Sequence, residues 1–150
     1  MTMFILWNIS STTKASTDDE PLKKEEEQQM RMDYYVQFWE LGIPWYFLAA
    51  VDQYERNLQD VRPDIPKREN VIAIQFSDEY WSGQLNPKEN DNEPFSIKIF
   101  NGMGLDGNGD GFANKNDDDD VLFTMATYLS EYGYNEEAFK LALWDYYKMN

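Results

Sequence analysis

Apolar side chains recur at helical spacing in four stretches of this chain, and the pattern predicts a mostly helical fold. The stretches cover residues 30–41, about 44–58, 121–129 and about 135–147. Gly42 ends the first stretch and Gly133 ends the third, because glycine favours the residue just past a helix. The fold class expected from this pattern is mostly α.

Two shorter segments have the composition of strands. Residues 71–76 form a β-rich apolar run, and residues 95–100 alternate between apolar and polar positions. The polar residues 86–94 between them indicate a loop. Residues 71–76 predict a short strand or an extended core segment, and residues 95–100 predict a strand or an extended loop, so we expect an α+β domain in which helices dominate.

The second helical stretch carries a carboxylate close to its apolar face. At about 100° per residue, the stripe expected to be buried places Glu55 at its edge. That stripe consists of Phe47, Ala50, Val51, Tyr54 and Leu58. Half-burial raises the pKa of a glutamate because it disfavours the charged form, which suits a general acid working near neutral pH. A glutamate that makes a salt bridge at the helix edge is the alternative interpretation.

The segment Asp-Gly-Asn-Gly-Asp-Gly-Phe has the ligand spacing of a calcium loop. Asp106, Asn108 and Asp110 supply side-chain oxygens at alternate positions, and Phe112 would supply its carbonyl. The twelfth position, usually glutamate, is Asp117, and three more aspartates follow it, so spacing alone leaves the closing ligand open. The alternative is a turn rich in Gly, Asn and Asp that leads into an acidic helix start.

Composition limits the chemistry that the chain can perform. The 150 residues suit one compact domain, and the net charge of -15 argues against nucleic acid and anionic membranes as partners. The chain has no cysteine and no histidine, which excludes disulfides, thiol catalysis and any site that needs an imidazole. Carboxylates, hydroxyls, lysine or a bound cation must supply any chemistry.

The amino-terminal end differs from the rest of the chain. Residues 1–9 are apolar but reach only about half the roughly 20 residues of a membrane span, and no basic flank precedes them. They are expected to be either the remnant of a signal or membrane anchor whose start is missing, or a frayed terminus. Residues 10–29 have the composition of a solvated linker. The folded domain is therefore placed at residues 30–150.

Several segments, taken in order, resemble parts of one enzyme family. Residues 41–55 are similar to the catalytic helix of the lysozyme-like soluble lytic transglycosylases, which delivers a single glutamate. Residues 74–76, Ile-Gln-Phe, resemble the Met-Gln-Phe segment that lines the family's glycan cleft. Residues 106–129 resemble a calcium loop and the helix after it, and residues 145–147, Asp-Tyr-Tyr, stand where the family has Ala-Tyr-Asn.

The resemblance implies a lysozyme-like fold and a role for each matching residue. Glu55 would protonate the bond between N-acetylmuramic acid and N-acetylglucosamine, and would then accept the proton of the sugar's own 6-hydroxyl. Gln75, Tyr80, Trp81 and Tyr146 would bind the sugars. The implied partner is the glycan strand of peptidoglycan outside the cytoplasmic membrane, with the protein as a monomer. Core packing is the alternative role for the aromatic residues.

The resemblance also implies a structural calcium ion in an EF-hand-like loop that is longer than usual. Its ligands would be Asp106, Asn108, Asp110, the Phe112 carbonyl and Asp120, with Asp120 in place of Asp117 as the closing residue. One departure affects the proposed acid, because Arg56 follows Glu55 where the family has serine. A nearby cation would favour the ionised carboxylate and weaken it as an acid.

The chain is further similar to the amino-terminal half of membrane-anchored, sporulation-associated murein endopeptidases, in which a zinc peptidase domain of the M23 type follows. This resemblance implies an excised or truncated part of a larger peptidase, and the truncation is expected to extend to a terminal helix of the lysozyme-like domain. Two other function classes therefore stand beside the glycan-cleaving enzyme. One is a non-catalytic module that binds the cell wall for a larger peptidase, and the other is a plain calcium-binding protein of EF-hand type.

Overall fold

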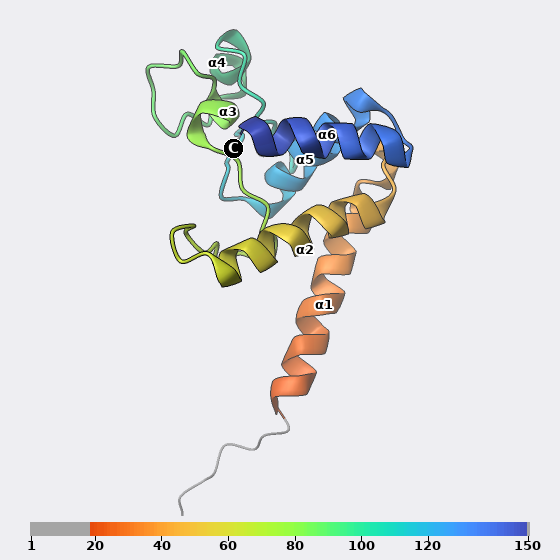
Figure 1. Cartoon of the computed structure of the whole chain (residues 1–150). Helices are drawn as coiled ribbons and strands as arrows, with labels where there is room; N and C mark the ends of the chain where they lie inside the picture. The colour runs from red at the N-terminus through yellow and green to blue at the C-terminus, as the bar shows by residue number, and fades with distance from the viewer. Residues whose placement is uncertain (1–18, 150) are drawn as a thin grey trace, which may run out of the picture.

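The computed structural model describes residues 19–149, which form helices joined by loops (Figure 1). The elements are α1 (Asp19–Gln37), the 3-10 turn η1 (Trp39–Leu41), α2 (Trp45–Val61), α3 (Asp78–Ser82), α4 (Pro94–Ile99), α5 (Asp118–Tyr132) and α6 (Glu136–Met149). None of the helices described is long and apolar enough to cross a membrane. The apolar remnant predicted at residues 1–9 lies outside the described residues.

The four helices predicted from periodicity are confirmed, but α1 is longer than expected. It begins at Asp19, inside the segment 10–29 that was predicted to be a linker, and much of it projects from the body of the molecule (Figure 1). Its Glu, Lys and Gln residues have high helix propensity, so the charge run that suggested a linker also suits a solvated helix. The polar loop predicted at residues 86–94 contains no helix before Pro94.

The β part of the predicted fold class is wrong, because residues 19–149 contain no strand. Residues 71–76 are an extended segment without a strand partner, and its carbonyl groups accept hydrogen bonds from side chains instead. Arg68 donates to the carbonyls of Ile72 and Ile74, and Gln59 donates to the carbonyl of Ala73. The mostly helical class is confirmed.

The second predicted strand, residues 95–100, is also wrong. It forms α4, in which Pro94 occupies the first turn, a position that suits proline because its missing N–H would be unpaired there. The alternation of apolar residues does not correspond to one buried face, because Ile97 is buried while Phe95 and Ile99 are exposed. A short helix that buries one side chain therefore has the same pattern as a short strand.

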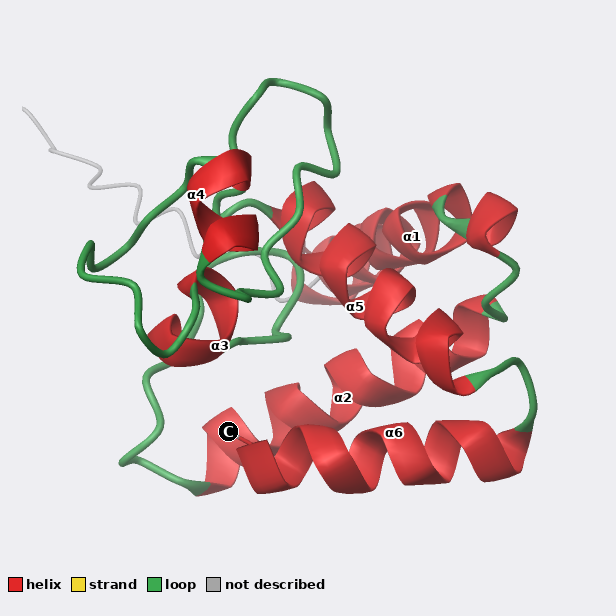
Figure 2. Ribbon diagram, turned by 90° about the horizontal axis from the view of Figure 1, so that it is seen from above, coloured by secondary structure: helices red, strands yellow, loops and turns green. Residues whose placement is uncertain are grey.

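The core lies around α5, which contacts α1, α2 and α6. Five residues predicted for its apolar face are fully or almost fully buried: Val121, Leu122, Met125, Ala126 and Leu129. Helices α2 and α6 lie side by side and run in the same direction (Figure 2). The rings of Phe47 and Phe139 stack between their amino-terminal halves, with centroids 4.1 Å apart. This pairing places the carboxyl-terminal turns of α2 and α6 beside each other.

Candidate functional site

Helix α2 is rotated relative to the prediction, and the rotation places Glu55 on its buried face. The buried residues are Phe47, Leu48, Val51, Asp52, Glu55 and Gln59. Ala50 and Tyr54, both predicted to be inward, are exposed instead. Glu55 therefore lies within the buried stripe, only 7% exposed, and not at its edge.

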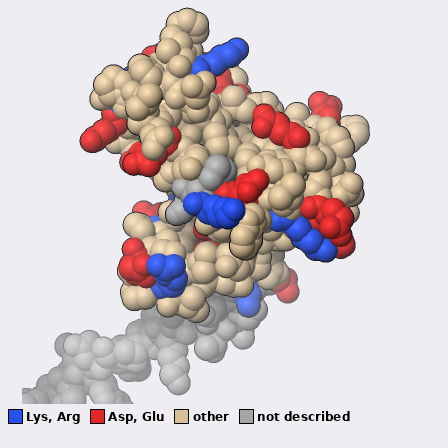
Figure 3. Space-filling view, turned by 45° about the horizontal axis from the view of Figure 1, so that its top comes forward, with Lys and Arg blue, Asp and Glu red and all other residues tan. Residues whose placement is uncertain are grey.

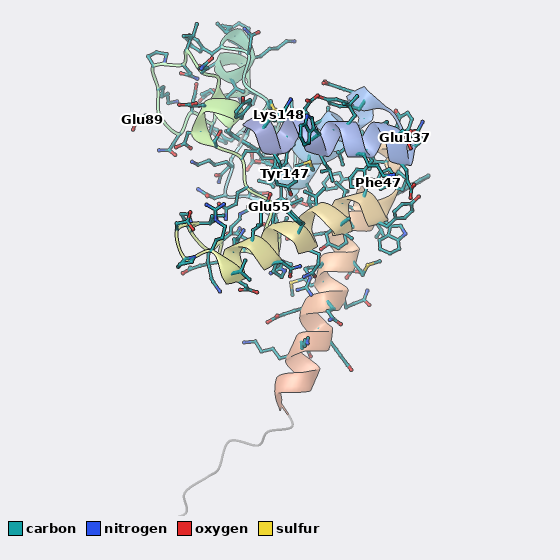
Figure 4. All side chains as sticks on the ribbon, viewed as in Figure 1. Phe47, Glu55, Glu89, Glu137, Tyr147 and Lys148 are labelled. Carbon is teal, nitrogen blue, oxygen red and sulfur yellow. The ribbon has the colours of Figure 1, made fainter. Side chains whose placement is uncertain are left out.

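A cleft of about 420 Å³ lies in front of the Glu55 carboxyl group. Tyr54, Leu58 and Arg62 line it from α2 and the residue that follows, and Tyr147 lines it from α6. Ile65 and residues 75–77 complete the wall. Figure 4 shows Glu55 and Tyr147 between the two helices, where α2 and α6 come together. The carboxyl group is thus both buried and adjacent to a space that a ligand can enter.

Burial raises the pKa of Glu55 from 4.5 to about 7. The Tyr147 side chain opposes this rise, and the negative charge of Asp52 adds to it. The effect is reciprocal, because burial and the Glu55 charge raise the pKa of Tyr147 and keep its hydroxyl protonated. Glu55 is therefore divided between its acid and carboxylate forms near neutral pH, with a phenol hydroxyl beside it.

Arg56, the residue expected to weaken Glu55 as an acid, is directed elsewhere. Its guanidinium pairs with Asp52 at 3.1 Å and donates to the carbonyl of Val71 at 2.7 Å. It is not among the groups that shift the pKa of Glu55. The serine-to-arginine departure from the family pattern therefore leaves the proposed acid unaffected.

Asp52 connects α2 to the extended segment that forms the floor of the cleft. The carboxylate is 1% exposed and accepts hydrogen bonds from the Tyr35 hydroxyl at 2.7 Å and from the backbone N–H of Ala73. Because residues 71–76 have no strand partner, these bonds and those from Gln59, Arg56 and Arg68 hold the segment in place. The position of the cleft floor relative to Glu55 therefore depends on side chains of α2.

Of the four residues predicted to bind sugar, only Gln75 lines the Glu55 cleft. Its side-chain amide donates to the Pro66 carbonyl at 2.9 Å. Tyr146 is 1% exposed and its hydroxyl donates to the carbonyl of Gln75, so it supports the cleft floor from the core. Tyr146 can position Gln75, but its ring lies among core aromatics.

Trp81 and Tyr80 lie away from the cleft. The Trp81 indole is 1% exposed and its N–H donates to the Ala113 carbonyl at 2.9 Å. Gly104 packs so closely against this ring that a Cβ at that position would lie 2.6 Å from it. Tyr80 lines a different hollow, between α3 and Phe100. For Trp81, packing in the core is the role that the geometry supports.

Tyr147 is the cleft residue that the sequence did not indicate. The resemblance assigned the active-site tyrosine to Tyr146, and the two neighbours point about 100° apart on a helix. The structure directs Tyr146 to the core and Tyr147 to Glu55. The ring of Tyr147 also meets the exposed ring of Tyr54 at 5.0 Å. The sequence shows two adjacent tyrosines, which place a hydroxyl on each of two faces of α6.

In the predicted calcium loop, the side chains fold back onto the loop's own backbone. Asp106 accepts from the N–H groups of Gly109 and Gly111, and Asn108 and Asp110 each accept from the N–H two residues on. Oxygen atoms of carboxylates and amides are the donors that a hard cation takes. Residues 19–149 nevertheless contain no group of three or more acidic side chains placed to share a metal ion.

Asp117 and Asp120, the two candidates for the closing ligand, differ in their surroundings. Asp117 caps α5 by accepting from the N–H groups of Asp119 and Asp120. Asp120 is fully buried and turns toward the loop, where it accepts from the N–H groups of Gly107, Asn108 and Asn114. Burial raises the pKa of Asp120, although these three hydrogen bonds act to lower it. Asp120 is thus the carboxylate that joins the loop to α5.

Comparison with known proteins finds one similar chain. Over 138 residues, the sequence is 41% identical to the L-Ala--D-Glu endopeptidase of Bacillus subtilis (strain 168). The match covers 92% of this chain and 41% of the relative, so the chain spans less than half the length of the protein it matches. No protein-family model and no solved structure matches. The chain is therefore similar to part of a cell-wall hydrolase.

Proposed function

We propose that this chain is a peptidoglycan-active domain that cleaves the glycan strand with one carboxyl group, as lytic transglycosylases do. The observation that carries the proposal is Glu55, whose pKa of about 7 is set by burial at the wall of an open cleft. A general acid works best when its pKa lies near the working pH. The relative is named as an endopeptidase for an L-Ala–D-Glu bond, so the proposal of glycan cleavage is based on the Glu55 site and not on the relative's name.

The proposed reaction uses Glu55 twice. The protonated carboxyl group donates its proton to the glycosidic oxygen as the bond from the anomeric carbon to that oxygen breaks. The resulting carboxylate then accepts the proton of the 6-hydroxyl on the same sugar, whose oxygen bonds to the anomeric carbon and closes an anhydro ring. No water is consumed, and Glu55 ends protonated, as it began. This sequence needs no second carboxylate across the bond, unlike hydrolysis by a pair of acids.

Tyr147 has a defined part in this proposal. Its hydroxyl is a donor without another partner among the described residues, and the Tyr147 side chain favours the ionised form of Glu55, the form that must accept the second proton. Burial acts in the opposite direction and favours the protonated form needed for the first step. The balance keeps both forms populated near neutral pH, which suits an acid that must also act as a base.

The test is incubation of the purified chain with peptidoglycan. We expect products that end in anhydro sugars, and we expect Glu55→Gln to slow their release by about 10²- to 10⁴-fold because the amide cannot transfer the proton. Glu137→Gln is the matched control, since that residue is exposed on α6 and remote from the cleft (Figure 4). Binding to peptidoglycan without any products would favour the non-catalytic wall-binding module. If the chain shows no binding and releases no products, both functions are excluded.

We further propose that the loop from Asp106 to Phe112 binds calcium as a structural ion, with Asp120 as the buried carboxylate that links the ion to α5. The support is the type and sequence spacing of the oxygen donors and the turn of Asp120 toward the loop. We expect calcium, but not magnesium at the same concentration, to raise the melting temperature of the chain. Asp110→Asn should reduce that rise, and an unchanged melting temperature in calcium would contradict the site.

A further inference from the structure

A second pocket adjoins the Glu55 cleft and has a different chemical character. Its volume is about 340 Å³, and it shares Gln75 and Phe76 with the cleft, so the two spaces meet along one wall. Its other lining residues come from two separate loops. Lys67, Arg68 and Asn70 belong to the loop after α2, and Lys115 and Asn116 belong to the loop before α5. We call it the basic pocket.

The basic pocket concentrates positive charge on a strongly acidic protein. It is lined by three cations, Lys67, Arg68 and Lys115, and by one acidic residue, Glu69. The whole chain has 13 lysines and arginines against 28 aspartates and glutamates, so this excess of cations runs against the composition. Figure 3 shows acidic and basic side chains scattered over the visible face of the molecule. The region is therefore suited to a negatively charged ligand.

Each cation of the basic pocket is held by a carboxylate that does not line the pocket. Lys67 pairs with Asp60 at 2.7 Å, and Lys115 pairs with Asp78. The Lys67 side chain is 65% exposed, whereas that of Lys115 is only 25% exposed. The exposed pair of Lys67 with Asp60 is weak, so a ligand carboxylate can exchange with Asp60 there.

Arg68 forms the buried part of the same wall. Its side chain is 7% exposed and pairs with Asp118 at 3.1 Å, while one terminal nitrogen donates to the carbonyls of Ile72 and Ile74. The guanidinium Nε–H has no hydrogen-bond partner among the described residues. The Arg68 charge is offset by Asp118, so Arg68 contributes a rigid wall with an unused donor behind the two lysines and no net positive charge.

We propose that the basic pocket binds a carboxylate of the acidic peptide branch carried by the glycan. This inference rests on the proposed function, because it takes a sugar at Glu55 as the point from which the branch departs. Gln75 and Phe76 border both spaces, so a substituent of that sugar would have to pass only these two residues to reach the basic pocket. The pocket then selects glycan that still carries its peptides over bare glycan, by charge and by the amides of Asn70 and Asn116.

The test measures binding by the Glu55→Gln chain, which prevents turnover, to two soluble glycan fragments of equal sugar length. One fragment carries peptide branches with free carboxylates, and the other has been stripped of them. We expect tighter binding of the peptide-bearing fragment, and we expect added salt to remove the difference by screening the exposed charges. Removing both lysines, with Lys67→Ala and Lys115→Ala together, should weaken this binding by about 3- to 10-fold.

The control double variant is Lys24→Ala with Lys98→Ala, which removes the same charge from exposed positions on α1 and α4. It should bind both fragments like the parent. The inference is overturned if the Lys67/Lys115 variant loses affinity equally for both fragments, or if it loses affinity for neither. The cleavage assay is separate: peptide-selective binding without any cleavage by the native chain refutes the catalytic proposal and leaves the basic pocket intact.

Discussion

Two buried carboxylates in different regions of the molecule have pKa shifts of opposite sign. Glu55 lies on α2 at the cleft, and Asp91 lies in the loop before α4. Burial raises the pKa of both. Asp91, however, accepts hydrogen bonds from Asn86, Lys88 and the backbone N–H of Glu93, and Ser96 also lowers its pKa. The net pKa of Asp91 is below its ordinary value, while that of Glu55 is about 7.

The difference shows that the number of donors, and not burial alone, separates a structural carboxylate from one suited to proton transfer. Asp91 is 1% exposed, yet its bonds favour the charged form strongly enough to overcome burial. For Glu55 the Tyr147 side chain is the one group that opposes burial, and the charge of Asp52 adds to the effect of burial. A buried acid with few donors beside a cleft is the arrangement expected of a functional site.

The largest effect is expected for Glu55→Gln on stability. The folded pKa of about 7 exceeds the unfolded value of 4.5, so the native chain loses stability as pH rises through this interval and bears the full cost above pH 7. The amide removes a cost of at most about 3 kcal/mol. Urea denaturation should show the variant to be more stable than the parent at pH 8 and equal to it near pH 4. Equal stability at pH 8 would contradict the raised pKa.

Asp91→Asn should lower the stability of the folded chain, the opposite of Glu55→Gln, and by a somewhat smaller amount. The amide keeps the shape but loses the charge that Lys88 and the other donors require, at a cost of about 1–2 kcal/mol near neutral pH. Because the folded pKa of Asp91 lies below the unfolded value of 3.8, the parent's advantage should persist above pH 4 and shrink as pH falls further. Asp60→Asn, at an exposed ion pair, serves as the control and should change stability little.

The smallest change is expected for Tyr147→Phe. Removing the hydroxyl removes the donor that favours ionised Glu55, so the pKa of Glu55 should rise above its value in the parent chain. The effect should not exceed that of one hydrogen bond, about 1 kcal/mol. Carboxyl chemical shifts followed through a pH titration measure it directly. Tyr54→Phe alters an exposed ring in the same cleft and should leave the titration in place, and a downward shift in Tyr147→Phe would refute the assignment.

Periodicity predicted those parts of the structure that depend on local spacing. The apolar stripe of α5 from Val121 to Leu129 and its end at Gly133 follow from the sequence, as does the existence of α2. The face of α2 was predicted about one position out of register. Tyr54 was assigned to the buried face but is exposed at the cleft. Asp52 was not assigned to that face but is buried, where it accepts hydrogen bonds from Tyr35 and Ala73. Bonds between distant segments decide such positions.

Other features required the assembled fold. The choice between Tyr146 and Tyr147 depends on the rotation of α6, which packing against α5 and α2 sets. Residues 71–76 have the composition of a strand but find no partner strand, so their carbonyl groups bond to Arg68 and Gln59. The basic pocket joins residues 66–70 to residues 115–116, and no local pattern indicates that these loops meet.

The position of Tyr147 beside Glu55 makes the cleft depend on two helices that are far apart in the chain. Glu55 belongs to α2, which is synthesised before α6, and α6 brings Tyr147 to the opposite wall. A nascent chain that has not yet acquired α6 carries the Glu55 side chain without that wall. The cleft is therefore complete only after α6 has docked.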